Sequence, residues 1–245
     1  MNRRVLFKIA ALAQPLHSFC CGPINYLGNF NMCGAYSLTI ESGKLVKRFK
    51  AKPPKVTYPK RYNIRPSQPL VAILNTDPEQ MTIAEWGIVP FWDKTGKKQI
   101  INARKDSLEK ATFKQSFHER RCLILADGFY EWKAVPGQKT KIPYRFVLKS
   151  EEPFAFAGIW QEKDDEPQAV IITTEPNELV GEVHNRMPAI LRPETENEWL
   201  NPDLEPDQAL GLLQTYPASK MSAYPVSTLV NMPRNDSVEV IKPAI

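Results

Sequence analysis

The sequence predicts an α+β fold, a single domain in which mainly antiparallel β-sheets curl around one core and a few helices flank them. Short apolar runs bounded by turn residues recur along the chain, and their β-branched and aromatic content favours strands. Helical periodicity is confined to a few short segments. The 22 prolines are scattered singly, which gives many rigid connections and few long helices.

The strands are predicted from apolar runs that are too short for ordinary helices. They cover residues 35–40, 70–74, 85–89, 122–126, 144–148, 154–160 and 169–173.

Four helices are expected. The clearest covers residues 107–119, where Asp106 or Ser107 can cap the start and Leu108, Phe113 and Phe117 recur at near-helical spacing. The others cover residues 176–184, 194–200 and 208–214. Residues 47–59 contain five lysines or arginines and three prolines, which predicts an exposed loop.

Residues 1–32 contain no acidic residue and admit three interpretations. They resemble a signal peptide, with a basic start and a short apolar stretch at residues 5–13 that Lys8 interrupts. They are otherwise a disordered tail, or an extension from an upstream start codon. We favour the extension. We therefore expect residues 1–31 to be a leader that is absent from or disordered in the working protein, and residues 32–245 to form the domain.

Composition excludes several classes of protein. No apolar run approaches the roughly 20 residues that cross a bilayer, so we expect no membrane partner. Cys33 and Cys122 are the only cysteines outside residues 1–32, and nothing has the spacing of a zinc site, so neither a disulfide scaffold nor a metal is expected. The net charge of +5 permits nucleic-acid binding without requiring it.

Cys33 directly follows the internal Met32. If the chain before Cys33 is absent or removed, Cys33 carries a free α-amine and a thiol on adjacent carbons. Such a 1,2-aminothiol can trap an aldehyde twice, first as an imine and then as a five-membered thiazolidine.

Two pairs of residues have side chains that could bind a substrate hydroxyl or a phosphate, or move a proton. Asn102 and Arg104 alternate, so both point to one side of an extended segment, where they can hold a hydroxyl and a phosphate. His184 is a candidate general acid or base, and Arg186 is a second phosphate ligand. The plainer alternatives are a turn-forming Asn, a surface Arg and a structural His.

Glu131 follows a nearly continuous apolar strand, where partial desolvation of the carboxylate would raise its proton affinity. The alternative is a salt-bridged surface Glu with Trp132 in the core. Trp86 and Trp92 flank a Gly and a Pro and could expose rings for base stacking. Core packing is the alternative, and we expect it to hold for at least one of these two.

Together these clusters resemble one family. The chain is similar to the SRAP family (SOS-response-associated peptidases, or abasic-site processing proteins of the HMCES/YedK type) over essentially all of residues 32–230. The matching segments are Met32-Cys33-Gly34, Tyr62-Asn63-Ile64-Arg65-Pro66, Trp86-Gly87-Ile88-Val89-Pro90-Phe91-Trp92, Asn102-Ala103-Arg104, Asp127-Gly128-Phe129-Tyr130-Glu131-Trp132 and His184-Asn185-Arg186-Met187-Pro188. In one departure, Ala35 stands where the family commonly has an arginine that contacts the DNA backbone.

The resemblance implies that the protein binds single-stranded DNA at an abasic site and cross-links to it through Cys33. Glu131 would move protons, His184 would assist sugar-ring opening and a possible β-elimination, and Asn102 would hold the adduct. Arg104 and Arg186 would grip phosphates, and Trp86, Trp132 and Asn63 would complete the DNA-binding surface. The resemblance implies no cofactor. We expect a monomer in the cytoplasm, on damaged nucleoid DNA.

Two other functions remain open from the sequence. One is a thiol autopeptidase in which Cys33 is the nucleophile and His184 the base, and which removes its own leader. The other is a DNA-binding module without chemistry, which would bind intact and abasic strands alike.

Overall fold

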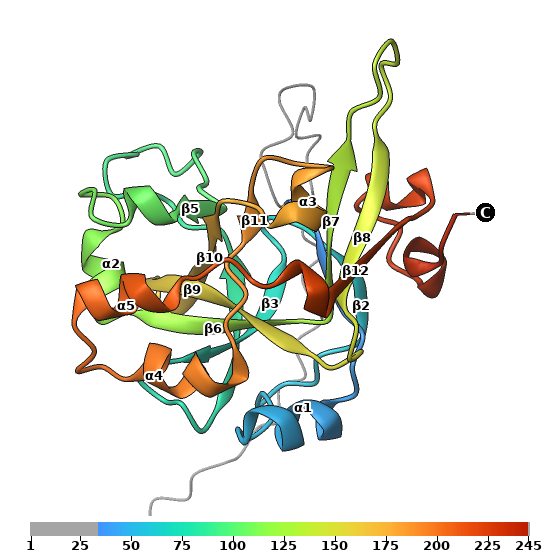
Figure 1. The fold of residues 1–245 in the computed structure, drawn as a ribbon. Coiled ribbons are helices and arrows are strands. Elements are labelled where there is room, and N and C mark those ends of the chain that lie inside the picture. Colours follow the sequence, from blue (N-terminus) through green and yellow to red (C-terminus); the bar gives the residue numbers. More distant parts are fainter. Residues whose placement is uncertain (1–33, 245) are drawn as a thin grey trace, which may run out of the picture. The chain divides into compact units, whose positions relative to one another are not determined.

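The computed structural model describes residues 34–244 and confirms the predicted α+β fold of mainly antiparallel sheets (Figure 1). One sheet has five strands in the order β12-β8-β7-β1-β2, and all its neighbours are antiparallel. Its strands are β1 (Tyr36–Leu38), β2 (Arg61–Ile64), β7 (Gly128–Lys133), β8 (Ile142–Leu148) and β12 (Met221–Pro225).

The second sheet follows the order β11-β10-β4-β3-β6-β9, and the extra pairing of β10 with β9 closes five of these strands into a barrel. Its strands are β3 (Pro69–Leu74), β4 (Met81–Trp86), β6 (Arg121–Ala126), β9 (Phe154–Lys163), β10 (Glu166–Thr174) and β11 (Met187–Pro188). A short strand, β5 (Asn102–Arg104), pairs in parallel with the C-terminal half of β10. The strand β10 therefore joins the barrel to β5 and β11.

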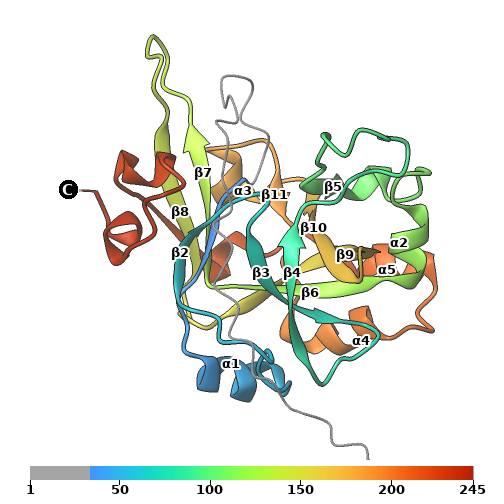
Figure 2. The same ribbon diagram turned by 180° about the vertical axis from the view of Figure 1, so that it is seen from behind.

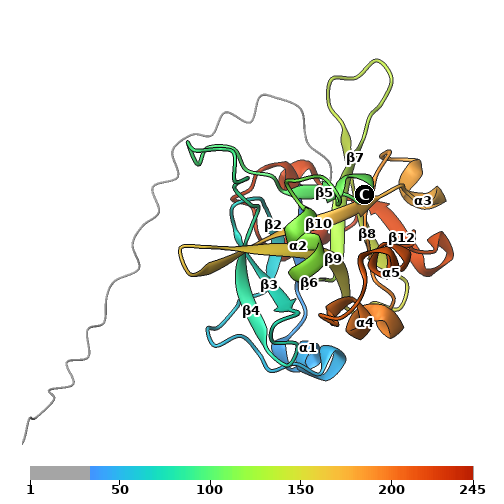
Figure 3. The same ribbon diagram turned by 90° about the vertical axis from the view of Figure 1, so that its left-hand side faces the viewer.

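The helices of the described chain are short and lie at the periphery of the sheets (Figures 2 and 3). They are α1 (Ser42–Phe49), α2 (Lys114–Glu119), α3 (Glu178–Gly181), α4 (Glu196–Leu200) and α5 (Pro206–Leu212). Single 3₁₀ turns cover Lys105–Ser107, Pro193–Thr195, Ala218–Lys220, Thr228–Asn231 and Val238–Ile241. No helix among residues 34–244 has the length and apolar character needed to span a bilayer.

Aromatic side chains from both sheets meet in one core. Tyr36 on β1 packs edge-on against Trp86 of the second sheet, with ring centroids 5.2 Å apart, and against Phe156 at 5.7 Å. Phe129 on β7 also contacts Phe156, and it stacks on Phe146 at 5.0 Å. Burial of such large rings dominates core energetics. These contacts hold β1 and β7 against the second sheet.

The structure differs from several local predictions. The predicted loop at 47–59 begins inside α1, and the predicted helix at 107–119 is α-helical only from Lys114. Leu108, Phe113 and Phe117 are buried as expected. The strand expected at 85–89 is β4, which ends at Trp86. The strands expected at 70–74, 122–126, 144–148, 154–160 and 169–173 are confirmed.

Candidate active site

The described chain begins beside Glu131. Strand β1 pairs with β7 so that Tyr36 lies opposite Phe129, and the Ala35 carbonyl accepts a 3.0 Å hydrogen bond from the Tyr130 N–H. Continuing this antiparallel register by one residue places Gly34 level with Glu131. Cys33 precedes Gly34 in the sequence. It lies outside the described residues, as does the leader predicted for residues 1–31.

Glu131 is a buried carboxyl group, with 2% of its surface exposed. Because side chains alternate along a strand, it shares a face of β7 with Phe129. Phe129 packs on Phe156 of the second sheet. Glu131 therefore lies on the face of the five-stranded sheet that is directed at the second sheet.

The second sheet presents Asn102 and Arg104 from β5. Asn102 lies level with Ile171 of β10 and Arg104 with Thr173, so both share one face with Ala169. Trp86 lies opposite Ala169 and therefore belongs to the same face. Since Trp86 packs on Tyr36, this face is directed at β1. The two sheets thus bring Asn102, Arg104 and Glu131 onto opposing faces.

Trp86 is part of the scaffold of this site. It has no exposed surface, and its indole N–H donates a 2.9 Å hydrogen bond to the carbonyl of Ile101, the residue before Asn102. A fully buried ring offers no face to a base, so Trp86 matches the alternative of core packing. Its contacts hold the segment that carries Asn102.

The two arginines expected to bind phosphate come together beside β10. Arg186 is 5% exposed, and it donates to the Thr173 carbonyl at 2.7 Å and to the Glu175 carboxylate at 2.8 Å. Arg104, opposite Thr173, is exposed, and its guanidinium forms a two-pronged pair with Asp106 at 2.6 and 3.0 Å. This pair lowers the pKa of the Asp106 carboxyl.

His184 lies just after α3, in the turn that leads to β11. Its Nδ1 accepts a 3.2 Å hydrogen bond from the backbone N–H of Arg186. With Nδ1 engaged as an acceptor, Nε2 is the ring nitrogen left to contact a ligand. His184 is partly exposed.

Asn63 ties β2 to the C-terminal segment. Its side-chain amide is fully buried, and its Nδ2 donates to the carbonyls of Val230, Met232 and Asn235 at 2.9–3.2 Å. Its Oδ1 accepts from the Arg65 guanidinium at 2.8 Å. These contacts use the Asn63 amide within the protein, as a residue with a structural role does.

Trp132 lies next to this junction. Its indole N–H donates to the Asn231 side chain at 2.7 Å, and the Arg65 guanidinium covers the ring at 5.3 Å from its centroid. Only 8% of Trp132 is exposed. Little of the Trp132 surface is therefore available to a ligand.

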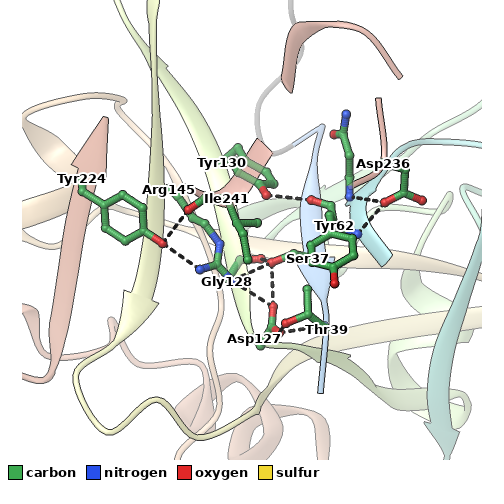
Figure 4. A network of polar contacts seen from close by, with 11 residues as sticks. Ser37, Thr39, Tyr62, Asp127, Gly128, Tyr130, Arg145, Tyr224, Asp236 and Ile241 are labelled. Atoms are coloured by element: carbon green, nitrogen blue, oxygen red, sulfur yellow. Dashed lines mark hydrogen bonds and ion pairs between the residues drawn. The ribbon is translucent and has the colours of Figure 1, made fainter. Parts of the chain in front are cut away.

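A polar network that includes Ser37 of β1 was not predicted from the sequence (Figure 4). Asp127 accepts from Ser37 Oγ at 2.6 Å and from the Thr39 N–H at 2.7 Å. Arg145 donates to Asp127 and to Tyr224 Oη, at 3.2 and 2.8 Å. The network ties β1 to β7, β8 and β12. The only available signal was the charged residue at the end of an apolar strand, and it does not identify the partners.

Trp92, the second tryptophan of the Gly- and Pro-containing segment, is an exposed side chain. It is 47% exposed, and its neighbour Phe91 is 67% exposed, in the loop between β4 and β5. Lys98 Nζ lies 4.8 Å from the Trp92 ring centroid. Asp93 braces the loop by accepting from Thr95 Oγ1 at 2.6 Å and from the Lys98 N–H at 2.6 Å. The loop thus presents exposed aromatic rings with lysine charge, as sequence-tolerant binders of single strands do.

Comparisons with known proteins place these residues in one family. The family model described as "SOS response associated peptidase (SRAP)" matches residues 32–233. "Abasic site processing protein YoqW" of Bacillus subtilis (strain 168) is 43% identical over 223 residues, which cover 86% of this chain and 99% of that protein. "Abasic site processing protein YoaM" of the same strain is 42% identical over 222 residues, which cover 86% of this chain and 97% of that protein.

The fold is also that of a solved structure. A crystal structure of a protein from Bacteroides thetaiotaomicron (Northeast Structural Genomics Consortium target BtR8) matches with a TM-score of 0.77 and 27% identity. The match covers 87% of this chain and all of that one. Every described residue discussed above from Gly34 to Asn231 lies within the span that the family model matches.

Proposed function

This chain belongs to the SRAP family, and on that premise we propose that it processes abasic sites by binding single-stranded DNA and capturing the lesion covalently through Cys33. The observation that carries the proposal is the position of Glu131. This buried carboxyl group lies level with Gly34, the residue that follows Cys33, and on the face directed at Asn102 and Arg104. Two relatives named as abasic site processing proteins support the choice of substrate.

The reaction uses the two nucleophiles of an N-terminal cysteine. An abasic deoxyribose equilibrates between a closed hemiacetal and an open C1′ aldehyde. The α-amine, with an ordinary pKa of about 7.7–8.0, attacks C1′ and loses water to give an imine. The thiol sulfur then adds to the imine carbon, and its proton passes to the nitrogen. The product is a thiazolidine. Because this closure is intramolecular, high effective molarity favours the ring.

Protein side chains supply the proton transfers. Glu131 takes a proton from the attacking amine and returns it to the departing hydroxyl as water leaves. As the hemiacetal opens, the proton of the anomeric hydroxyl passes to the ring oxygen of the sugar, and His184 assists by a hydrogen bond from Nε2 to that oxygen. Asn102 accepts and donates hydrogen bonds to the adduct. No step needs a metal or an organic cofactor.

The DNA strand is held by charge and by stacking. Arg104 already pairs with the carboxylate of Asp106, an anionic partner comparable to a phosphate. Arg186 contributes a buried positive charge beside it. Trp92 and Phe91 supply exposed rings for neighbouring bases.

The proposal is tested with abasic single-stranded DNA and protein whose first residue is Cys33. We expect a heat-stable adduct, no adduct from Cys33→Ala, and similar non-covalent affinity in both proteins. A Cys33→Ser protein keeps the amine, so it should give only an adduct that requires borohydride reduction. A heat-stable adduct from Cys33→Ala, or from a protein with an uncleaved residue before Cys33, would refute the mechanism.

The intact mass of the purified protein tests the alternative function, an autopeptidase that removes its own leader. If the full chain purifies with Cys33 as its first residue, and His184→Ala prevents this, a self-processing step precedes lesion capture. Equal processing of the His184→Ala protein assigns removal of the leader to another agent.

A further inference from the structure

A pocket of about 350 Å³ lies beside α1. The helix α1 is at the bottom in Figures 1 and 2, whereas β5, α3 and β11 lie in the upper half of the domain. Buried apolar side chains of Leu38, Leu45 and Val71 line the pocket together with three prolines of residues 53–59. Its volume is at the lower end of the range for pockets that hold small ligands, and it accommodates one large apolar side chain.

The chain segment that forms most of this pocket is positively charged. Residues 42–76 contain nine lysines and arginines and no acidic residue. Four of the nine form ion pairs with distant carboxylates, as in Arg48 with Glu196 at 2.7 Å. Four exposed lysines have no carboxylate within ion-pair distance among residues 34–244: Lys47, Lys50, Lys52 and Lys55. Lys55 itself lines the pocket.

We propose that this pocket docks a partner protein through an acidic peptide that carries one large apolar side chain. The apolar side chain fills the pocket, and the flanking carboxylates face the four lysines. Such an anchor in a pocket with a complementary charged rim is how short peptide segments gain both affinity and specificity. The lesion chemistry proposed above is not required for this docking.

A nucleic acid fits the pocket less well. Its lining is mainly aliphatic and proline side chains, and the one aromatic residue, Tyr58, is only partly exposed and donates its hydroxyl to the Pro69 carbonyl at 3.2 Å. Base binding by stacking needs an exposed ring. Residues 1–32 of this chain contain no acid, so they lack the charge that complements the lysines.

The test uses a fluorescein-labelled peptide in which four aspartates precede a single phenylalanine, and its anisotropy with the protein near 0.15 M salt. We expect saturable binding. The peptide should bind at least about tenfold more weakly to a Lys52→Glu, Lys55→Glu double variant, because like charges then face each other across the interface. Val56→Asp, at the pocket wall, should weaken it similarly. The matched control Lys97→Glu, Lys98→Glu reverses two charges in the loop between β4 and β5 and should leave peptide affinity unchanged.

Three results would overturn the proposal. One is equal binding of a peptide whose phenylalanine is replaced by serine, which would reduce the effect to charge alone. Another is displacement of the peptide from the Lys97→Glu, Lys98→Glu protein by single-stranded DNA, which would make this a nucleic-acid surface. The third is the absence of saturable binding to a protein that still cross-links abasic DNA. Loss of cross-linking in Cys33→Ala with peptide binding intact separates this proposal from the preceding one.

Discussion

Glu131 is an acid placed where water scarcely reaches it. Only 2% of the residue is exposed, and it lies at the level where β1 begins. The proton transfers proposed for Glu131 require a fixed position more than they require solvent. The strand pairing supplies that position, because β7 is held between β1 and β8.

We predict that Glu131→Gln slows adduct formation on the order of a hundredfold or more, the usual contribution of a positioned general acid or base. The amide keeps the size of the side chain but transfers no proton. Single-turnover cross-linking over a range of pH measures the rate, and the exposed Glu178→Gln serves as the control. A wild-type rate for Glu131→Gln would remove Glu131 from the chemistry.

Gly128 is a second residue with a strict steric constraint. A Cβ added there would lie 2.8 Å from Arg145 Nε and 2.9 Å from its Cζ. Arg145 cannot simply swing away, because it bonds Asp127, Ser37 and Tyr224 in a buried site.

Gly128→Ala should therefore lower the free energy of unfolding by about 1–3 kcal/mol, the usual cost of overpacking. Gly211→Ala in α5 is the matched control, because no atom other than those of its chain neighbours and its own helix backbone lies within 4 Å of the added Cβ. Alanine there should stabilise the helix by about 0.5–1 kcal/mol. Urea denaturation compares the two, and equal effects would contradict the packing argument.

At the scale of elements, the tryptophan of strand β4 and that of the loop between β4 and β5 differ in exposure. Trp92 stands on the loop with nearly half of its surface exposed, whereas Trp86 at the end of β4 is wholly buried. Gly87, with φ of +118°, makes the bend that separates them, and Gln99 lies too close for any side chain there.

We expect Trp92→Ala to weaken binding of single-stranded DNA by about 1–3 kcal/mol, the value of one stacked base, without changing thermal stability. Trp86→Phe should lower thermal stability without changing the binding of single-stranded DNA. It loses the indole bond to Ile101 and leaves a cavity, so unfolding becomes easier by about 1–3 kcal/mol. Fluorescence anisotropy and calorimetry measure the two effects, and a fall in the melting temperature of Trp92→Ala would argue against an exposed binding role.

Elements with an unbroken apolar run were predictable from the sequence, and β6 and β9 are examples. Others carry no such pattern. Strand β7 is buried on both faces and includes a carboxylate, so neither alternation nor a continuous apolar run marks it. Helix α1 has three basic residues among its eight and Leu45 as its buried residue, and its last three residues belong to the basic, proline-containing segment that predicted a loop.

The candidate site was proposed from residue types, and the sequence contained little indication of its arrangement. Asn102, Arg104 and Arg186 lie close together along β10, and alternation predicted a common side only for Asn102 and Arg104. Nothing in the local sequence indicated which of Trp86 and Trp92 is exposed, since both flank the same Gly and Pro. The proximity of Gly34 to Glu131 depends on a strand register between segments almost a hundred residues apart.

Over the whole described domain, Cys122 reports on global unfolding. It is fully buried, a Cβ on Gly158 would lie 2.8 Å from its sulfur, and burial raises the pKa of its thiol well above the ordinary value. The unfolded thiol ionises near pH 8.5. Above that pH the unfolded state therefore binds fewer protons than the folded state, and stability falls as the pH rises.

Between pH 8.5 and 10, ionisation of the Cys122 thiol in the unfolded state should cost the wild-type chain about 1.5 kcal/mol of stability. We predict that the Cys122→Ala variant lacks this loss. The variant is less stable at pH 7 because of the smaller side chain, so the comparison is of slopes. Guanidinium unfolding at several pH values gives both slopes. Parallel curves for the two proteins would show that the thiol ionises equally in the folded state.

The bonds of Asn63 and Trp132 to residues 230–235 have a consequence for synthesis on the ribosome. Strands β2 and β7 are synthesised well before this later segment. The hydrogen bonds of Asn63 and Trp132 to it therefore form only after it has left the ribosome. If the proposed function holds, ribosome-bound chains that still lack this segment should not capture damaged DNA.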